Sequence, residues 1–248
     1  NEDDCIAQIR YLLGFLPSNN MEDAPLVDTG DDPTREDEGL NSLLPDNSNM
    51  PYDMKDVIAA TVDNGEYYEV QPFYATNIIT CFARFDGQSV GIIANQPKVM
   101  AGCLDINASD KSSRFIRFCD AFEIPVLSIT NVTGFKACMC AEKGLAKALA
   151  HMTSAFASAT CPKVNLIAGD AFGSAYVTMN SKSIGADLVY AWPETKIGMM
   201  DAELAAKIMY ADASADVLAE KAKEYEKLRS NVVTATRSGY VDLIIEPA

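Results

Sequence analysis

The first part of the chain alternates between short apolar stretches and polar stretches rich in turn-forming residues. Residues 5–16, CIAQIRYLLGFL, carry apolar side chains at helical spacing and stop before Pro17, which predicts a short amphipathic helix. Residues 20–51 are rich in Asp, Asn, Pro and Gly and show little periodicity, so we expect an extended connector there. A second short helix is predicted over residues 53–62, with Asp53 as its N-cap.

The remainder of the chain begins with two apolar, β-branched runs and then alternates strand and helix patterns. Residues 78–85 and 88–95 flank Asp86-Gly87, a favoured two-residue turn, and predict an antiparallel hairpin. Further helices are expected at 109–122, 139–159, 172–182, 201–210 and 213–229, and further strands at 125–131, 163–168 and 187–192. Short apolar strands that alternate with helices are typical of parallel pairing with both faces buried. The pattern therefore predicts an α/β fold.

Charge divides the chain near residue 70. Residues 1–70 hold 17 of the 35 acidic residues and 3 of the 20 basic residues, whereas residues 71–248 are almost balanced. We therefore expect an acidic leader of interdomain-linker type with short helices over residues 1–70, followed by one body over residues 71–248. The net charge of −15 argues against nucleic acid or an anionic membrane surface as the main partner.

Several classes of protein are excluded by what the sequence lacks. His151 is the single histidine, so metal sites that need two or more imidazoles are absent. The apolar runs are far shorter than the ~20 residues that span a bilayer, so we expect no membrane insertion. We also expect no secretory signal, because no basic segment followed by an apolar stretch opens the sequence. The seven cysteines are then expected to be reduced, largely buried thiols of a cytoplasmic protein.

Two turns at the ends of predicted strands carry the candidate chemistry. In parallel α/β folds, ligands gather beyond the carboxyl ends of the strands, where helix N-termini present unpaired N–H groups. Residues 131–135 (NVTGF) and residues 169–175 (GDAFGSA) occupy such places. Small residues at 173–175 let a substrate oxygen approach the main chain, whose N–H groups can hold an oxyanion. Glycine in such turns also has a purely geometric explanation, and the residues alone leave both readings open.

Long motifs along nearly the whole chain resemble the C-terminal half of the acyl-CoA carboxyltransferase family. They read GIIANQP at 91–97, GCLDINAS at 102–109, RFIRFCDAFEIP at 114–125, AFGSAY at 171–176, YAWPETKIGMM at 190–200 and GYVDLIIEP at 239–247. YLLGFLPSNN at 11–20 and LLPDNSNMPYDMKDVI at 43–58 resemble the segment that joins the two homologous halves of that family. The resemblance implies a crotonase-like ββα superhelix. It also implies transfer of CO2 between carboxybiotin and an acyl-CoA, as in the biotin-dependent carboxylases, transcarboxylases and sodium-pumping decarboxylases.

The same resemblance assigns roles to particular residues. It implies that main-chain amides of Gly173, Ser174 and Ala175 form the oxyanion hole for biotin, with Ser174 contributing its N–H rather than its hydroxyl. Gly134 and Phe135 are implied to supply the facing contacts. Gly144 and Leu145 are implied to be two further cofactor-binding residues. Val177 is implied to bind the substrate, and it stands where many propionyl-CoA-type enzymes carry Asp.

The resemblance further implies that the chain needs partners. In the family acyl-CoA is held mainly by the N-terminal half, which this sequence lacks, so we expect an N-terminal carboxyltransferase half or subunit. We also expect a biotin carboxyl carrier protein and a homo-oligomer, either a dimer or a trimer of dimers.

Two features depart from the family pattern. Gly173-Ser174-Ala175 stands where Gly-Gly-Ala is usual, and residues 136–145 are one residue shorter and lack the usual second glycine.

Other functions remain open on the sequence alone. One is a structural subunit that keeps the fold but has lost biotin turnover, and another is a stand-alone crotonase-type hydratase or isomerase.

Ser174 and His151 could be read as parts of a hydrolytic triad, although no GxSxG elbow surrounds Ser174. Cys138 and Cys140 form a CxC pair without a second pair at ligand spacing, so we expect ordinary thiols. Lys111 is expected on a solvated helix face rather than on CoA phosphates, and Met199 in the core.

Overall fold

A single mixed sheet organises the molecule. The computed structural model describes residues 1–45 and 50–248, and within them eight strands pair in the order β1-β2-β3-β4-β5-β6-β8, with β7 beside β5. β1 to β3 are antiparallel, and every later pair is parallel. The strands are β1 Tyr67–Glu69, β2 Ile78–Phe85, β3 Gln88–Asn95, β4 Val126–Val132, β5 Lys163–Phe172, β6 Leu188–Ala191, β7 Ile197–Gly198 and β8 Leu243–Ile244. The predicted α/β fold with parallel pairing is confirmed.

The hairpin has the bounds that the sequence predicted. β2 and β3 pair from Ile78 opposite Asn95 to Phe85 opposite Gln88. Asp86 and Gly87 have φ of 50° and 75°, the left-handed values that a two-residue turn between twisted strands requires. A side chain at position 87 would place its Cβ only 2.0 Å from the carbonyl oxygen of Val27, so the leader passes directly over the turn. Local turn chemistry thus sets the register of this part of the sheet.

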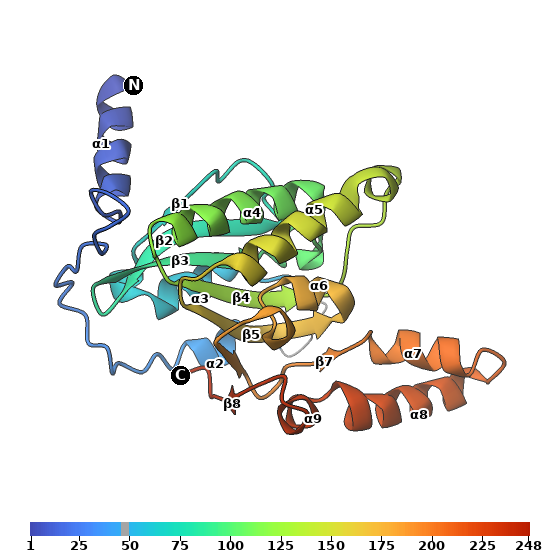
Figure 1. Cartoon of the computed structure of the whole chain (residues 1–248). Coiled ribbons are helices and arrows are strands. Elements are labelled where there is room, and N and C mark those ends of the chain that lie inside the picture. The colour runs from blue at the N-terminus through green and yellow to red at the C-terminus, as the bar shows by residue number, and fades with distance from the viewer. Residues whose placement is uncertain (46–49) are drawn as a thin grey trace.

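Helices cover both faces of the sheet, as Figure 1 shows. α4 (Ile106–Ala121) and α5 (Met139–Ser158) pack on one face, where Phe115 meets Phe82 of β2. α3 (Met54–Thr61), capped by Asp53 as predicted, packs with the alternate side chains of β2 and β3 on the other face. The remaining α-helices are α1 Glu2–Leu13, α2 Leu40–Leu43, α6 Gly173–Thr178, α7 Ala202–Met209, α8 Ala215–Tyr225 and α9 Val232–Arg237. Strands buried on both faces fit the near-continuous apolar runs of the sequence.

The leader covers the body and contributes to its core. α1 buries none of its own residues, but Phe15, which follows it, is fully buried and stacks on Phe82 at 6.2 Å between ring centroids. The carboxylate of Asp63 accepts the N–H groups of Asp86 and Gly87 at 3.0 and 2.8 Å. The division of the chain at residue 70 stays a prediction, and residues 46–49 of the expected connector lie outside the described residues.

Three local expectations were wrong. The helix expected at 172–182 is the shorter α6, because β5 extends to Phe172. Lys111 is 2% exposed rather than solvated, and its ammonium donates to the carbonyl oxygens of three residues between 71 and 78. Burial lowers the pKa of Lys111 to about 8. Met199 is 76% exposed instead of lying in the core.

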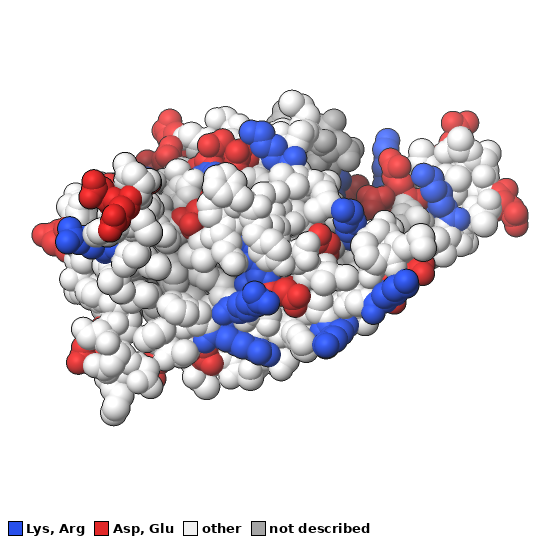
Figure 2. Space-filling view, turned by 90° about the horizontal axis from the view of Figure 1, so that it is seen from above, with Lys and Arg blue, Asp and Glu red and all other residues white. Residues whose placement is uncertain are grey.

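The surface reflects the charge balance of the body. On the face seen from above, acidic and basic side chains are interspersed with uncharged ones (Figure 2). Arg114 and Arg117 of α4 are exposed. Among the described residues, no helix combines the length and apolar character that crossing a bilayer requires.

Candidate functional site

The two turns singled out from the sequence lie side by side. β4 and β5 are neighbouring parallel strands, and Val132 pairs with Ala171 at their carboxyl ends after a shift in register. Gly134 lies two residues after Val132, and Gly173 lies two residues after Ala171. The carboxyl edge of the sheet therefore brings together the segments around 134–135 and 173–175, where ligands of such folds gather.

The first turn of α6 has free main-chain donors. Gly173 has φ of 62°, a left-handed value that glycine adopts without strain, and a Cβ there would lie 3.1 Å from the carbonyl oxygen of Met199. Phe172, the N-cap, makes no side-chain capping bond. Within residues 1–45 and 50–248, no hydrogen bond outside the helix uses the N–H of Ser174 or Ala175, and the first turn of a helix has no internal acceptor for them. Ser174 is exposed and Ala175 is 1% exposed, so an external oxygen reaches this turn from the side of Ser174.

The facing turn is fixed to the segment that precedes α4. The carbonyl oxygen of Gly134 accepts the N–H of Leu104 at 3.1 Å, and Lys136 donates its N–H to the carbonyl oxygen of Leu104 at 2.9 Å. Phe135, between them, is half-buried and packs on the core. The two bonds fix the turn to the segment before α4, as a preorganised wall of a site requires.

The remaining predicted residues lie on the two helices that follow these turns. Val177 is on α6, one turn beyond Gly173, and 36% of it is exposed. Gly144 and Leu145 are in the second turn of α5 and are half-buried. A Cβ at Gly144 would lie 3.1 Å from the Cδ1 atom of Ile106, so this glycine allows α5 to approach the N-terminus of α4. The structure thus joins 134–135 with 173–175 and ties Gly144 to the start of α4.

Sequence reasoning missed a polar network centred on Asn131 at the end of β4. Its side-chain amide donates to the hydroxyl of Tyr52 at 2.9 Å and accepts the N–H of Asp170 at 3.1 Å. Burial raises the pKa of Tyr52 to about 12, and burial raises the pKa of the Asp170 carboxyl, which nearby Lys196 lowers in part. Tyr52 lies 79 residues before Asn131, and no local pattern marks such a contact.

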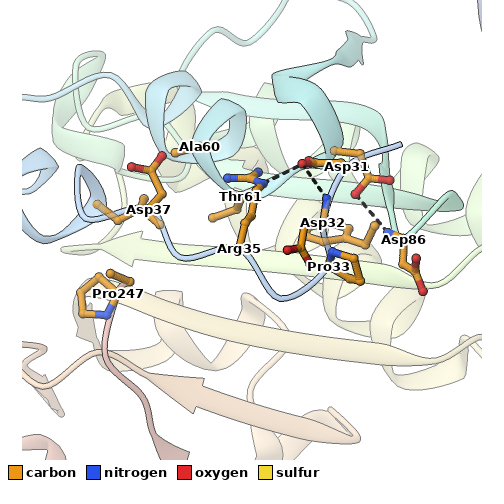
Figure 3. Close-up of a pocket in the computed structure, with 13 residues that line it drawn as sticks. Asp31, Asp32, Pro33, Arg35, Asp37, Ala60, Thr61, Asp86 and Pro247 are labelled. Atoms are coloured by element: carbon orange, nitrogen blue, oxygen red, sulfur yellow. Dashed lines mark hydrogen bonds and ion pairs between the residues drawn. The ribbon is translucent and has the colours of Figure 1, made fainter. Parts of the chain in front are cut away.

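An acidic hollow of about 420 Å³ lies at the other edge of the sheet (Figure 3). Arg35 pairs with Asp31 there at 3.1 Å, and Asp86 stands at the wall that the hairpin provides. Asp86 precedes β3, which runs parallel to β4, so this hollow is at the amino edge and away from the two turns. Among the described residues, no group of three His, Cys, Asp or Glu side chains is arranged to hold a metal ion.

Comparisons with known proteins connect this arrangement to one family. The chain is 67% identical to the methylmalonyl-CoA decarboxylase subunit alpha of Veillonella parvula, over 100% of this chain and 48% of that protein. It is 44% identical to the propionyl-CoA carboxylase beta chain of Roseobacter denitrificans, over 100% of this chain and 49% of that one. The chain thus spans about half the length of these relatives, and it corresponds to their C-terminal half.

The fold comparison agrees with the sequence comparison. The crystal structure of transcarboxylase 12S, with methylmalonyl-coenzyme A and methylmalonic acid bound, matches with a TM-score of 0.93 and 43% identity, over 97% of this chain and 47% of that one. The crotonase-like fold implied by the resemblance is confirmed. The profile of the Carboxyl transferase domain family matches residues 1–248. This match along the whole sequence, together with the shared fold, establishes that the chain belongs to the carboxyl transferase domain family.

Proposed function

We propose that this chain is the biotin-side half of a carboxyltransferase that moves CO2 between carboxybiotin and an acyl-CoA of the methylmalonyl-CoA or propionyl-CoA type. The observation that carries the proposal is the start of α6, where no described residue outside the helix accepts the N–H groups of Ser174 and Ala175, beside the 134–135 turn. The relatives that share the whole of this chain support the reaction type and the acyl group. The two oxyanion roles, for the biotin oxygen and for the thioester oxygen, are part of the proposal.

The residues at the α6 turn suit biotin chemically. Biotin supplies a ureido ring that carries the carboxyl group and takes up negative charge at its ring oxygen when that group leaves. The N–H groups of Ser174 and Ala175 donate to that oxygen, and the partial positive charge of the helix N-terminus adds to their effect. Gly173 has the left-handed conformation from which both N–H groups follow in the chain. No side chain needs to gain or lose a proton at these atoms, so the hydroxyl of Ser174 is dispensable.

The other predicted residues take supporting roles in this proposal. Phe135 and the turn at Gly134 form the wall facing α6, and Gly144 and Leu145 continue it along α5. Val177, exposed on the next turn of α6, borders the acyl end of the substrate. A valine there presents an apolar contact where a carboxylate would present charge.

The proposed enzyme is assembled from several chains. The N-terminal half, present in the longer relatives, holds the acyl-CoA, and a biotin carboxyl carrier protein delivers the cofactor. We propose a homo-oligomer, and the 12S relative is a hexamer. A cytoplasmic location is part of the proposal and fits seven cysteines that are all free thiols.

The test is biotin-dependent decarboxylation of methylmalonyl-CoA by the chain assembled with its N-terminal half. Ser174→Pro removes the N–H at a position where a helix tolerates proline, and Ser174→Ala removes only the hydroxyl. We expect Ser174→Ala to retain kcat within about threefold and Ser174→Pro to lose about 10²–10³-fold, the cost of one oxyanion donor. Circular dichroism and the oligomeric state serve as folding controls. Equal activity of the two variants would contradict the proposal.

The alternatives predict different outcomes in the same experiment. A subunit with a purely structural role would give no biotin-dependent turnover in any variant, although it would still bind the N-terminal half. A stand-alone hydratase would hydrate an enoyl-CoA without its partner. That activity needs a general base at the turns, and Asp170, a half-buried carboxylate at the end of β5, precedes the turn of α6.

A further inference from the structure

Cys138 and Cys140 form a close pair of thiols at the start of α5. Cys138 is the N-cap, with extended backbone (φ −157°, ψ 162°), and its Sγ accepts the N–H of Ala141 at 3.3 Å. Cys140 is the second residue of the helix, and its Sγ lies 2.6 Å from that of Cys138. The capping conformation turns the first side chain back over the helix end, so the spacing of two residues places both sulfur atoms together.

This pair is open to small molecules. Cys140 is exposed and Cys138 half-buried, whereas Cys81, Cys119 and Cys161 are buried. Both thiols border a hollow of about 250 Å³ between the starts of α4 and α5. Its lining residues are Asp105, Ile106, Asn107, Lys136, Cys138, Cys140 and Ala141. A low-molecular-weight disulfide can therefore reach the sulfur atoms without any opening of the core.

The two thiols differ in acidity, and each difference has a physical cause. Hydrogen bonds from the S–H of Cys140 and the N–H of Ala141, together with nearby Lys136, lower the pKa of Cys138. The same sulfur–sulfur hydrogen bond raises the pKa of Cys140. By contrast, burial raises the pKa of Cys161 to about 11. One member of the pair is thus the better nucleophile, and the other is held beside it as a resolving thiol.

We propose that Cys138 and Cys140 are a redox-active dithiol that a low-molecular-weight disulfide converts reversibly into an intramolecular disulfide. The Cys138 thiolate attacks one sulfur of the reagent, forms a mixed disulfide and releases the first thiolate. Cys140 then gives its proton to solvent and attacks the Sγ of Cys138, which forms the Cys138–Cys140 bond and releases the second thiolate. Two protein thiols are oxidised and one disulfide is reduced to two thiols, so the exchange balances.

The experiment treats the complete enzyme with glutathione disulfide, blocks the remaining thiols and identifies peptides by mass spectrometry. Trypsin cuts after Lys136 and Lys143, which isolates ACMCAEK at 137–143 with no other cysteine. We expect this peptide to be lighter by two hydrogen atoms, without alkylation, and to regain both thiols with dithiothreitol. Cys5, an exposed cysteine of the same chain without a neighbouring thiol in the described structure, is the internal control and is expected to carry a glutathione adduct instead.

Two variants assign the steps. In Cys140→Ser the mixed disulfide at Cys138 cannot resolve, so a stable glutathione adduct is expected there. In Cys138→Ser we expect Cys140 to react several-fold more slowly than Cys138 does in the parent chain, at a rate near that of Cys5. Two alkylated cysteines in the parent peptide, or glutathione adducts on it that persist, would each overturn the proposal. None of these readouts depends on carboxyl transfer.

Discussion

The starts of α5 and α6 follow neighbouring parallel strands but meet the need for helix capping in opposite ways. Helix α5 begins at an extended cysteine whose sulfur takes the N–H of Ala141. Helix α6 begins at Phe172 without a side-chain cap and turns sharply at Gly173, and the N–H groups of Ser174 and Ala175 have no acceptor outside the helix in the described structure. At the start of α5 the protein itself supplies the capping acceptor, whereas at the start of α6 the N–H donors are left for solvent or a ligand.

This difference indicates which helix start can bind an external hydrogen-bond acceptor. Unpaired N–H groups cost stability when they are buried, so an uncapped helix start persists where solvent or a ligand satisfies it. Ser174 is exposed and meets that condition. The capped start of α5 contributes nucleophilic sulfur instead of free amides. In our two proposals, the same edge of the sheet thus offers two kinds of chemistry, one electrostatic and one covalent.

Of three further changes, Gly173→Ala should have the largest effect on kcat. Gly173→Ala forces an L side chain into a left-handed conformation and places its Cβ 3.1 Å from the carbonyl of Met199. We expect a loss of about 1–2 kcal/mol in the free energy of unfolding and a fall in kcat of about 10²-fold, because the donors no longer point at the same place. Urea unfolding and steady-state kinetics measure the two effects. Unchanged kcat in a folded variant would show that the turn does not aim the donors.

Removing the Asn131 side chain, which connects β4 to β5 and Tyr52, should mainly lower stability. Asn131→Ala leaves the hydroxyl of Tyr52 and the N–H of Asp170 without their partner. The free energy of unfolding is expected to fall by about 1–3 kcal/mol, as for other unsatisfied buried polar groups. Tyr52→Phe removes one of the two contacts and is the milder matched variant. If both variants were as stable as the parent, the network would contribute nothing to positioning β4 and β5.

Removing the cap of α5 should have the smallest effect. Cys138→Ala deletes the sulfur that accepts the N–H of Ala141, so hydrogen exchange is expected to accelerate at that amide while Tm changes by at most about 2 °C. Cys138→Ser supplies a better capping acceptor and should restore protection. Decarboxylation by the assembled enzyme should stay unchanged in both. A loss of activity comparable to that of Gly173→Ala would remove the distinction between the two helix starts.

Much of this fold could be predicted because its signals are local. The hairpin of β2 and β3 follows from Asp86-Gly87 between β-branched runs, and α3 begins where Asp53 can cap it. The short strands β1, β7 and β8 were missed, since two or three residues carry no periodicity and their pairing depends on distant segments. The burial of Phe15 and Lys111 was missed for the same reason: each meets partners that only the folded chain supplies.

The candidate site was only partly predictable. The strand–turn–helix pattern located both turns, and the parallel register of β4 and β5 brings them together as expected. The polar network of Tyr52, Asn131 and Asp170 has no sequence signal, because its members become neighbours only through the order of strands and the path of the leader. The roles of Gly134, Phe135, Gly144, Leu145 and Val177 come from the family resemblance and stay predictions.

The most direct test of the central claim replaces single N–H groups by ester oxygens and keeps the side chains. Replacing Ala175 by lactic acid converts one amide into an ester. The control is the ester at Thr178, made with the hydroxy acid that keeps the threonine side chain, because the N–H of Thr178 points back into α6. In the complete enzyme, we expect the ester at 175 to lower kcat for biotin-dependent decarboxylation about 10²–10³-fold with an unchanged KM for methylmalonyl-CoA. The ester at 178 should change kcat by less than about fivefold. Equal kcat for the two esters would contradict the claim that free main-chain amides at the start of α6 stabilise the developing charge.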